Sequence, residues 1–478
     1  MSKLFGICHL SFAIPTMFLY NTLSGKKEEL AKPTGRPLKM FVCGLTVYDY
    51  PHIGNGRTFV IFDAFVKYLR SKGWDVFYLQ NVTDIDDKII ARAAEEKTTW
   101  RKISKKFERI YHRNERQLGI DSVTAYARAT DHVKEILRQT EVLMEKGFAY
   151  RIEGDGIYFD VSKFPDYGKL SRRTYLDAED SVSRIDESVM KRHKGDFALW
   201  KFSKPGEPTW RAKLGDGRPG WHIEDTAISE KYLGNQYDLH GGGVDLKFPH
   251  HEAEIAQAEA ASGKKPFVKI WMHSGHLMVN DKKMSKSLGN FVTLDDFLKG
   301  HSGNAFRFLV LSHHYRSPMN YTEALVKNSE DTLKSLEIFM NKLVFIAKKT
   351  KGRPAEGNFE AEIKKADERM GEFLDDDFNT PGMFGMLFSF VSSLENSVWQ
   401  LGRTETQLLL KTIRARMASL GFHFPTTKVP LKIKRLAAKR ELFRKNKQFV
   451  QSDDLRKRIK DLGYSIDDTP LGPFVYKS

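Results

Sequence analysis

The residues best suited to chemistry begin in the stretch from Met40 to Thr58, MFVCGLTVYDYPHIGNGRT. It contains His52 and Cys43, one of only two cysteines in the 478-residue chain. Gly54 and Gly56 let backbone amides approach a bound group closely, and the N-terminus of the helix that follows favours an anion. The stretch therefore predicts an anion-binding turn at the start of a helix.

Two further clusters belong with this stretch, one from Gly220 to Glu254 and one from Lys282 to Ser287. Each cluster is ambiguous alone, because PHIGNGR could be an ordinary tight turn and a Lys-Met-Ser-Lys sequence is more often a solvated surface loop. Their order along a split α/β sheet is much harder to explain by chance. We therefore interpret the three clusters as parts of one site.

The elements that position these clusters form two α/β halves. In the first half, a buried strand reaches Cys43, a helix spans about residues 54–71, and residues 75–82 form the next, parallel strand. Short β-rich runs on either side of a helix that begins at Pro249 form the second half. Open α/β sheets bind ligands at the carboxyl ends of such strands, which is where the clusters lie.

The rest of the chain surrounds these halves. Residues 18–37 read as a polar loop, and residues 149–161 alternate like an antiparallel hairpin. Residues 160–220 read as an irregular insertion rather than a separate core. Helices are expected from the Lys282 loop to the end of the chain.

Composition limits the class of protein and its partners. The formal net charge is +16, and residues 401–478 hold 18 Lys and Arg against 7 Asp and Glu, which suits a phosphate-backbone partner better than a merely solvated helical face. With only Cys8 and Cys43, a disulfide framework is excluded and a cytoplasmic location is expected. The mildly apolar Met1 to Phe18 lacks a clear cleavage site, so we expect no signal peptide or membrane span and consider Met17 as the true start.

The motifs resemble those of the class I aminoacyl-tRNA synthetases, and within that class the cysteinyl-tRNA synthetase family, over nearly the whole chain. His52-Ile53-Gly54-Asn55 resembles the first class signature and Lys283-Met284-Ser285-Lys286-Ser287 the second. The motifs that point to the cysteine branch are VCGLTVYD, NVTDIDDK, RPGWHIE and HGGGVDLKFPHHEAEIAQ, which begin at residues 42, 81, 218 and 240.

The resemblance implies an α/β, Rossmann-like class I catalytic domain split by an inserted connective region and followed by an all-α helical tRNA-binding domain. We predict an N-terminal lead-in, the first catalytic half, the connective insertion, the second catalytic half, the KMSKS loop with a stem-contact region, and a helical anticodon-binding domain with a basic end. Their respective boundaries are residues 1–37, 38–125, 126–219, 220–280, 281–325 and 326–478.

The implied reaction begins with in-line attack of the L-cysteine carboxylate on the α-phosphate of ATP, with Mg²⁺ accompanying the nucleotide. Such a step needs positioning and stabilisation of charge on the phosphoryl oxygens. His52, Asn55 and the helix N-terminus at Gly54 would donate to phosphate, while Lys283 and Lys286 would supply mobile positive charge. Asn55 replaces the second histidine of the class signature, and its amide can still donate.

The resemblance also implies where the two small substrates lie. The glycines Gly241 to Gly243 would let the nucleotide lie against the backbone, with Gly243 in contact with ATP and Asp245 holding the ribose hydroxyls. The amino-acid pocket would be lined by Gly44, Thr83, Trp221 and His240. For Trp221, simple core packing is an alternative of almost equal weight.

The resemblance also implies a zinc ion, which the family holds through two cysteines, a histidine and a glutamate. The ion in turn binds the substrate thiolate. Cys43, His250 and Glu254 match three of these ligands, and His250 and Glu254 stand one helical turn apart, so both would face one metal. His251 would point elsewhere and be structural. Asp225 stands where the family has its second cysteine, which replaces a soft thiolate with a hard oxygen.

Two interpretations of this departure remain. In the first, Cys43, Asp225, His250 and Glu254 still hold one Zn²⁺ and a substrate thiolate completes the shell. In the second, the metal is weak or absent and the pocket recognises cysteine by shape. We favour the first because three matched ligands remain, and because an apolar pocket alone discriminates poorly between cysteine and serine.

The implied partners are tRNA(Cys), ATP and L-cysteine, with the chain acting as a monomer. Two alternatives are considered. An ATP-dependent ligase of the same fold that joins cysteine to an amino sugar would lack the long basic helical end. A catalytically idle RNA-binding paralogue is suggested by Asp225 and Asn55, although both signature loops and the ATP pocket persist.

Overall fold

A five-stranded parallel sheet lies at the centre of the protein. We describe it from a computed structural model, in which residues 16–173, 190–285, 289–350, 359–424 and 428–478 are described. The strand order is β11 (Val268–Ser274), β10 (Tyr237–Gly243), β3 (Leu38–Thr46), β4 (Val76–Thr83) and β5 (Ala125–Arg128). The two predicted halves are therefore one sheet, and they meet where β10 lies beside β3.

The residue types explain this central position. β3 is apolar along most of its length and buried from Met40 to Cys43, as expected for a strand covered on both faces. The helix α1 (Ile53–Ser71) follows it and buries Phe59, Phe62 and Phe65 among its core residues. The first βαβ unit predicted from the sequence is confirmed, because β3 and β4 pair in parallel. β5 was not predicted.

The region between the two halves contains the predicted hairpin, formed by β6 (Ala149–Ile152) and β7 (Gly156–Phe159). The interpretation of residues 160–220 as an insertion without a core is wrong. There β8 (Phe197–Phe202) and β9 (Gly217–Pro219) extend the hairpin into a four-stranded sheet, and this sheet covers an apolar cluster distinct from that of the central sheet. The extra strands are short and far apart in sequence, so local patterns did not reveal them.

The N-terminal lead-in is not a loop throughout. β1 (Met17–Asn21) and β2 (Lys26–Leu30) form an antiparallel hairpin, with Met17, Leu19 and Leu30 buried against the core. Its polar partner strand, KKEEL, gave little sequence signal because most of its side chains face solvent. Residues 1–15, on which the signal-peptide question depends, lie outside the described residues.

The loop region after β11 contains a small sheet in the order β13, β12, β14. Its strands are β12 (Leu277–Val279), β13 (Lys282–Lys283) and β14 (Met319–Tyr321). Two short helices, α7 (Leu294–Gly300) and α8 (Gly303–Leu311), lie between β13 and β14 in the chain. We call β12, β13 and residues 284–285 the KMSKS arm.

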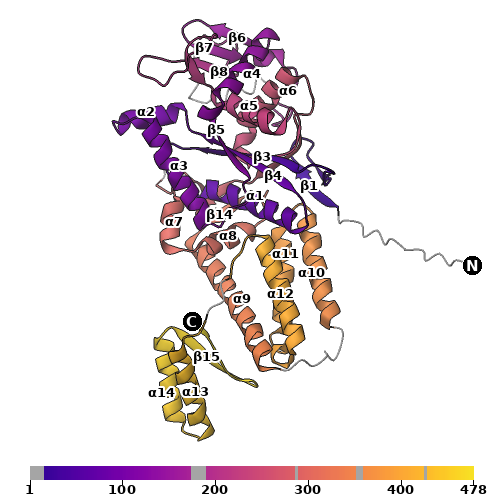
Figure 1. Cartoon of the computed structure of the whole chain (residues 1–478), viewed down its shortest axis with the longest axis vertical. Helices are drawn as coiled ribbons and strands as arrows, with labels where there is room; N and C mark the ends of the chain where they lie inside the picture. The colour runs from indigo at the N-terminus through magenta and orange to yellow at the C-terminus, as the bar shows by residue number, and fades with distance from the viewer. Residues whose placement is uncertain (1–15, 174–189, 286–288, 351–358, 425–427) are drawn as a thin grey trace, which may run out of the picture.

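The predicted C-terminal helical region is confirmed, and its helices are α9 (Glu323–Lys349), α10 (Phe359–Asp375), α11 (Thr380–Leu394), α12 (Arg403–Ser419), α13 (Leu431–Lys445) and α14 (Phe449–Asp461). It is not entirely α-helical, because it ends in the hairpin β15 (Tyr464–Thr469) and β16 (Gly472–Lys477). In Figure 1 the pair α13 and α14 lies at the opposite end of the molecule from β6, β7 and β8. None of the helices in the described ranges is long and apolar enough to cross a membrane.

Candidate active site

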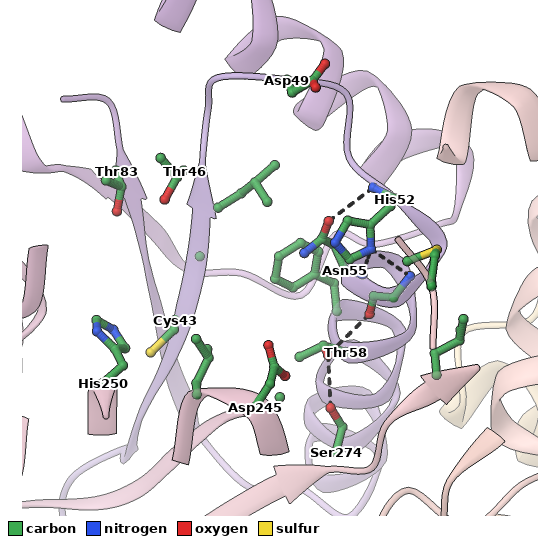
Figure 2. A pocket seen from close by; sticks show the side chains of 18 of the residues that line it. Cys43, Thr46, Asp49, His52, Asn55, Thr58, Thr83, Asp245, His250 and Ser274 are labelled. Carbon is green, nitrogen blue, oxygen red and sulfur yellow. Dashed lines mark hydrogen bonds between the residues drawn. The ribbon is translucent and has the colours of Figure 1, made fainter. Parts of the chain in front are cut away.

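A cavity of about 640 Å³ opens where β3, β4, β10 and β11 end. Figure 2 shows Cys43 and His250 on one side of it and His52 and Asn55, at the start of α1, on the other. Residues from all three sequence clusters line it, namely Cys43, Gly44, His52, Gly54, Asn55, Trp221, Asp225, Gly243, Asp245, His250 and Lys283. The structure thus brings together most of the residues singled out from the sequence.

The turn that begins α1 is organised by His52 and Asn55. His52 Nδ1 accepts hydrogen bonds from the backbone amides of Gly54 (3.1 Å) and Asn55 (3.3 Å), and Asn55 Oδ1 accepts one from the His52 amide (3.1 Å). Because Nδ1 accepts, a neutral His52 ring carries its proton on Nε2. Two helix amides expected to face an anion are therefore bonded to His52, whereas the Asn55 amino group is a hydrogen-bond donor at the cavity (Figure 2).

The glycines at the end of β10 are needed for close packing inside the protein as well as for the approach of a nucleotide. A Cβ atom at Gly241 would collide with the Phe62 ring, and one at Gly242 would lie 2.7 Å from His251. Only Gly243 of the three lines the cavity, next to Asp245. The expectation that the whole run contacts nucleotide is therefore wrong for Gly241 and Gly242, which are small because the helices behind the sheet pack closely against it.

The four residues predicted to bind metal lie together. Ligand atoms of Cys43, Asp225, His250 and Glu254 all lie within 4.8 Å of one another, and all four residues are buried. His250 Nε2 is 3.0 Å from Asp225 Oδ2 and 3.0 Å from Glu254 Oε1. Asp225 comes from α5 (Trp221–Leu233), while His250 and Glu254 come from α6 (His250–Ser262), whose first residue confirms the predicted helix start.

The electrostatics of this cluster suit a cation. Burial raises the pKa of the Cys43 thiol, and the charges of Glu254 and Asp225 raise it further. Burial and Asp225 also raise the pKa of Glu254. One imidazole, that of His250, faces two buried carboxylates, so ionising the thiol and both carboxylates together would leave more negative charge than these residues neutralise. A divalent ion would supply the missing charge and reverse these shifts, so the donor set fits a metal.

His251 was expected to point away from this cluster, and that expectation is wrong. Its Nε2 lies 3.1 Å from Cys43 Sγ, and its Nδ1 lies 2.8 Å from His273. The physical reason is that α6 is buried from His250 to Ala260, so adjacent residues on different faces both meet protein. Cys43, Glu254, His251 and His240 form a second group of potential ligands.

Three of the four residues expected to contact the amino acid line the cavity, namely Gly44, Thr83 and Trp221. Trp221 stacks on the His250 ring, with 4.3 Å between centroids, and is only partly buried, which favours the pocket over simple core packing. His240 lies elsewhere. It stacks on Trp271, 3.3 Å from Cys43 Sγ, and does not contribute to the described cavity wall.

Sequence reasoning missed several residues that orient these groups. Asn81 Nδ2 donates to Asp225 Oδ1 (2.5 Å), Thr83 donates to the buried Glu224, and His222 Nδ1 lies 2.7 Å from His250 Nδ1. Burial, followed by the charge of Asp225, raises the pKa of Glu224. The available signal was their place within NVTDIDDK and RPGWHIE, next to residues that were selected.

The second signature is only partly described. Lys283 ends β13 and lines the cavity together with Met284. Lys286 and Ser287 lie outside the described residues, so their expected position at the phosphates stays a prediction.

Comparison with known proteins gives a consistent result. The family of tRNA synthetases class I (C) catalytic domains matches residues 30–331. The chain is 42% identical to a cysteine–tRNA ligase of Geobacter metallireducens, covering 95% of this chain and 98% of the relative. It is 40% identical to that of Thermococcus gammatolerans, with the same coverage of both chains. In structure it is similar to Mycobacterium tuberculosis methionyl-tRNA synthetase bound by methionyl-adenylate, with a TM-score of 0.60 and 14% identity over 80% of this chain and 91% of that one.

Proposed function

Because the chain belongs to the cysteine–tRNA ligase family of class I aminoacyl-tRNA synthetases, we propose that the cavity at the strand ends is its site of cysteine activation. The protein is an ATP-dependent enzyme that converts L-cysteine to cysteinyl-adenylate and then charges tRNA(Cys), releasing pyrophosphate and AMP. Neither the amino-sugar ligase nor the idle paralogue is needed to explain it.

We assign the side of the cavity nearest α1 to ATP. His52, through Nε2, and Asn55, through its amino group, would donate to the phosphoryl oxygens as negative charge develops on them. Lys283, at the cavity wall, and Lys286, in the same signature, would neutralise the departing pyrophosphate. Asp245 at the end of β10 would accept hydrogen bonds from the ribose hydroxyls.

We assign the opposite side to L-cysteine and a Zn²⁺ ion held by Cys43, Asp225, His250 and Glu254. When bound, the ion would hold the substrate thiolate and so separate cysteine from serine, which differs by one atom. Cys43, Asp225 and His250 line the cavity, whereas His240 and His251 do not, and this supports the first ligand group over the second. Gly44, Thr83 and Trp221 would position the rest of the amino acid.

The observation that carries this assignment is that three of the four metal ligands and the phosphate donors line a single cavity. Its test is elemental analysis of chelator-washed protein, paired with cysteine-dependent ATP–pyrophosphate exchange. We expect about one zinc per chain, lost in Cys43→Ser and kept in Asn55→Ala, with exchange impaired in both. A reproducible absence of zinc from active wild-type enzyme would sink the metal assignment while leaving the phosphate side intact.

The tRNA would bind along the helical region, with its anticodon end at α13 and α14. These helices expose many lysines and arginines, at the end of the molecule far from β6, β7 and β8 (Figure 1). A basic surface suits recognition of tRNA through shape and phosphates. The domain boundaries predicted above remain part of this proposal, as does action in the cytoplasm, where the enzyme's substrates are used in translation.

A further inference from the structure

Arg57, in the first turns of α1, is a buried charged residue whose partners are backbone groups. Its side chain is only 1% exposed, yet it forms no ion pair with any described residue. Its guanidinium instead donates to four backbone carbonyls, those of Gly275 (2.7 Å), His276 (2.6 Å), Tyr315 (3.3 Å) and Ser317 (2.5 Å). Burying a guanidinium is costly unless its donors are satisfied, and here both terminal nitrogens are paired while Nε has no hydrogen-bond partner in the described part of the chain.

The four carbonyls share a place in the fold. Gly275 and His276 directly precede β12, and Tyr315 and Ser317 precede β14. These two strands pair in parallel, and β12 pairs with β13, which carries Lys283. Arg57 therefore holds together the starting points of the two strands that support the KMSKS arm.

The backbone around these carbonyls leaves little freedom. The Gly275 amide donates to the Tyr315 carbonyl (2.8 Å), and the Met319 amide donates to that of His276 (2.9 Å). A Cβ atom at Gly275 would lie 2.5 Å from the carbonyl oxygens of both Arg316 and Ser317. The two segments thus lie in direct contact, and the guanidinium fixes their spacing from the side of α1.

The other end of the signature loop is also tied to α1. The Ile53 amide donates to the Val292 carbonyl (3.1 Å), and the Leu294 amide donates to that of Pro51 (2.8 Å). The turn that contains His52 therefore contacts the residues just after the loop through its backbone. Arg57, one turn further along α1, contacts the segments that lead into β12 and β14.

We propose that Arg57 is a positioning residue for the activation step, which sets the KMSKS arm at the correct distance from the phosphate donors His52 and Asn55. It touches no reacting atom, and it acts by fixing where Lys283 can meet the leaving pyrophosphate. This inference rests on the proposed role of the signature loop in activation. A displacement of about 1 Å in such a site can lower the reaction rate about 100-fold, so the loss of one positioning residue can have an effect of this size.

The test compares two steps in the full-length enzyme after normalising for active sites. Arg57→Met removes all the carbonyl contacts, and Arg57→Lys keeps the charge with fewer donors. We expect Arg57→Met to lower cysteine-dependent pyrophosphate exchange at least about 10-fold and to change transfer from isolated enzyme-bound cysteinyl-adenylate to tRNA(Cys) by less than about 3-fold. Arg57→Lys should fall between wild type and Arg57→Met in exchange.

A second buried arginine provides the matched control. Arg307 in α8 is fully buried and donates to the carbonyls of Leu118, Gly119 and Leu420, away from the KMSKS arm. Arg307→Met should lose at least as much thermal stability, because it also leaves the buried Asp63 without this partner, yet keep both normalised rates within about 3-fold.

Two results would overturn the inference. One is an equal loss in exchange and transfer for Arg57→Met, and the other is no loss in either. If Arg57→Met does not fold, Arg57→Lys decides by the same comparison. Lys283→Ala separates this inference from the proposed function. If it slows exchange while the Arg57 variants do not, only the positioning role fails. If it leaves exchange unchanged, the role of Lys283 and the positioning role fail together, while cysteine activation itself stands.

Discussion

Asn81 links the two sides of the candidate metal site through one side-chain amide. Its Nδ2 donates to Asp225 Oδ1 across 2.5 Å, while its Oδ1 accepts the backbone amide of Gly44, the residue after Cys43, also at 2.5 Å. Asp225 then presents its other oxygen to His250 at 3.0 Å. A carboxylate at position 225 can accept this amide and still offer an oxygen to a metal, so the fold accommodates the departure from the family's cysteine.

Replacing Asn81 with alanine should therefore weaken metal binding without removing a ligand. Loss of an orienting partner behind a ligand typically lowers metal affinity about 10- to 100-fold, and we expect Asn81→Ala to fall in this range. Competition with a chromophoric chelator would measure it. Asn114→Ala is the matched control, because Asn114 is also fully buried and donates to a carboxylate, Asp295 Oδ1, at 2.7 Å outside the cavity. Equal zinc affinities for the two variants would contradict this role.

Restoring the family's ligand with Asp225→Cys should tighten zinc binding, because a second thiolate replaces a hard oxygen. The same change leaves the Asn81 amide without its acceptor, so the metal-free variant should lose about 1–3 kcal/mol of stability. Cobalt substitution provides the spectroscopic measurement, since each thiolate adds sulfur-to-metal charge-transfer intensity. The band should grow in Asp225→Cys and disappear in Cys43→Ser alone, which leaves no thiol among the four ligands. An unchanged spectrum in Asp225→Cys would show that residue 225 does not reach the metal.

The sequence predicted much of this site because its motifs combine residue type with spacing. Cys43 is the last buried residue of β3, and His250 and Glu254 share a helix face, so their convergence follows from local geometry. His251 could not be placed in this way, since α6 is buried on every face and helical spacing no longer separates inside from outside. The same limit applies to Gly241 and Gly242, whose small size reflects long-range packing against Phe62 and His251.

The fold likewise contains elements that local sequence patterns predicted and elements that they did not. The parallel pair β3 and β4 was predictable from two apolar runs joined by an amphipathic helix. The hairpin of β1 and β2 was not, because β2 has only one buried side chain, Leu30. The strands β8 and β9 pair over long separations along the chain, which no local pattern encodes. Arg57 belongs to the first motif and was expected to face ATP with His52, but it is buried, and its partners, more than 200 residues away, could not be predicted for the same reason.

Asp238, in β10, should make stability depend on acid pH. Burial would raise the pKa of its carboxyl, but bonds from Arg36, the Lys39 amide and Lys269 lower that pKa to about 2. A lowered folded-state pKa stabilises the protein above about pH 4, and this stabilisation is lost as the pH falls toward 2. Because Arg36 is 40% exposed, solvent screens the pair, and we expect no more than about 2 kcal/mol.

The corresponding experiment is urea unfolding of wild type and Asp238→Asn between pH 7 and pH 2. The variant should be less stable at pH 7, and the difference should shrink as the pH falls below 4. Asp461→Asn, at an exposed position in α14, is the control and should show little difference at any pH. A gap between wild type and Asp238→Asn that stays constant to pH 2 would contradict the assigned ion pair.

The basic surface of α13 and α14 should determine the salt dependence of tRNA binding. Lys445 and Lys447 lie at the exposed turn between these helices. Each contact to a phosphate contributes about 1 to the slope of log affinity against log salt, so the double variant Lys445→Gln, Lys447→Gln should reduce that slope by about 2. Filter binding at several salt concentrations measures it. Lys264→Gln, at an exposed position in the loop after α6, should leave the slope nearly unchanged. Equal slopes for all three proteins would place the tRNA elsewhere.

Asn55 performs two tasks that paired substitutions can separate. Its Oδ1 caps α1 by accepting the His52 amide, and its amino group faces the cavity. Asn55→Ala removes both functions, whereas Asn55→Asp keeps the acceptor and removes the donor. If donation to the phosphoryl group is what matters, both variants should lower the rate of cysteinyl-adenylate formation about 10- to 1000-fold, with a smaller effect on ATP affinity, because the bond strengthens as charge develops. Rapid-quench measurement of adenylate formation against ATP concentration gives both quantities. A near-normal rate in Asn55→Asp would mean that capping alone explains the residue, since a carboxylate there retains the cap and opposes the phosphate charge.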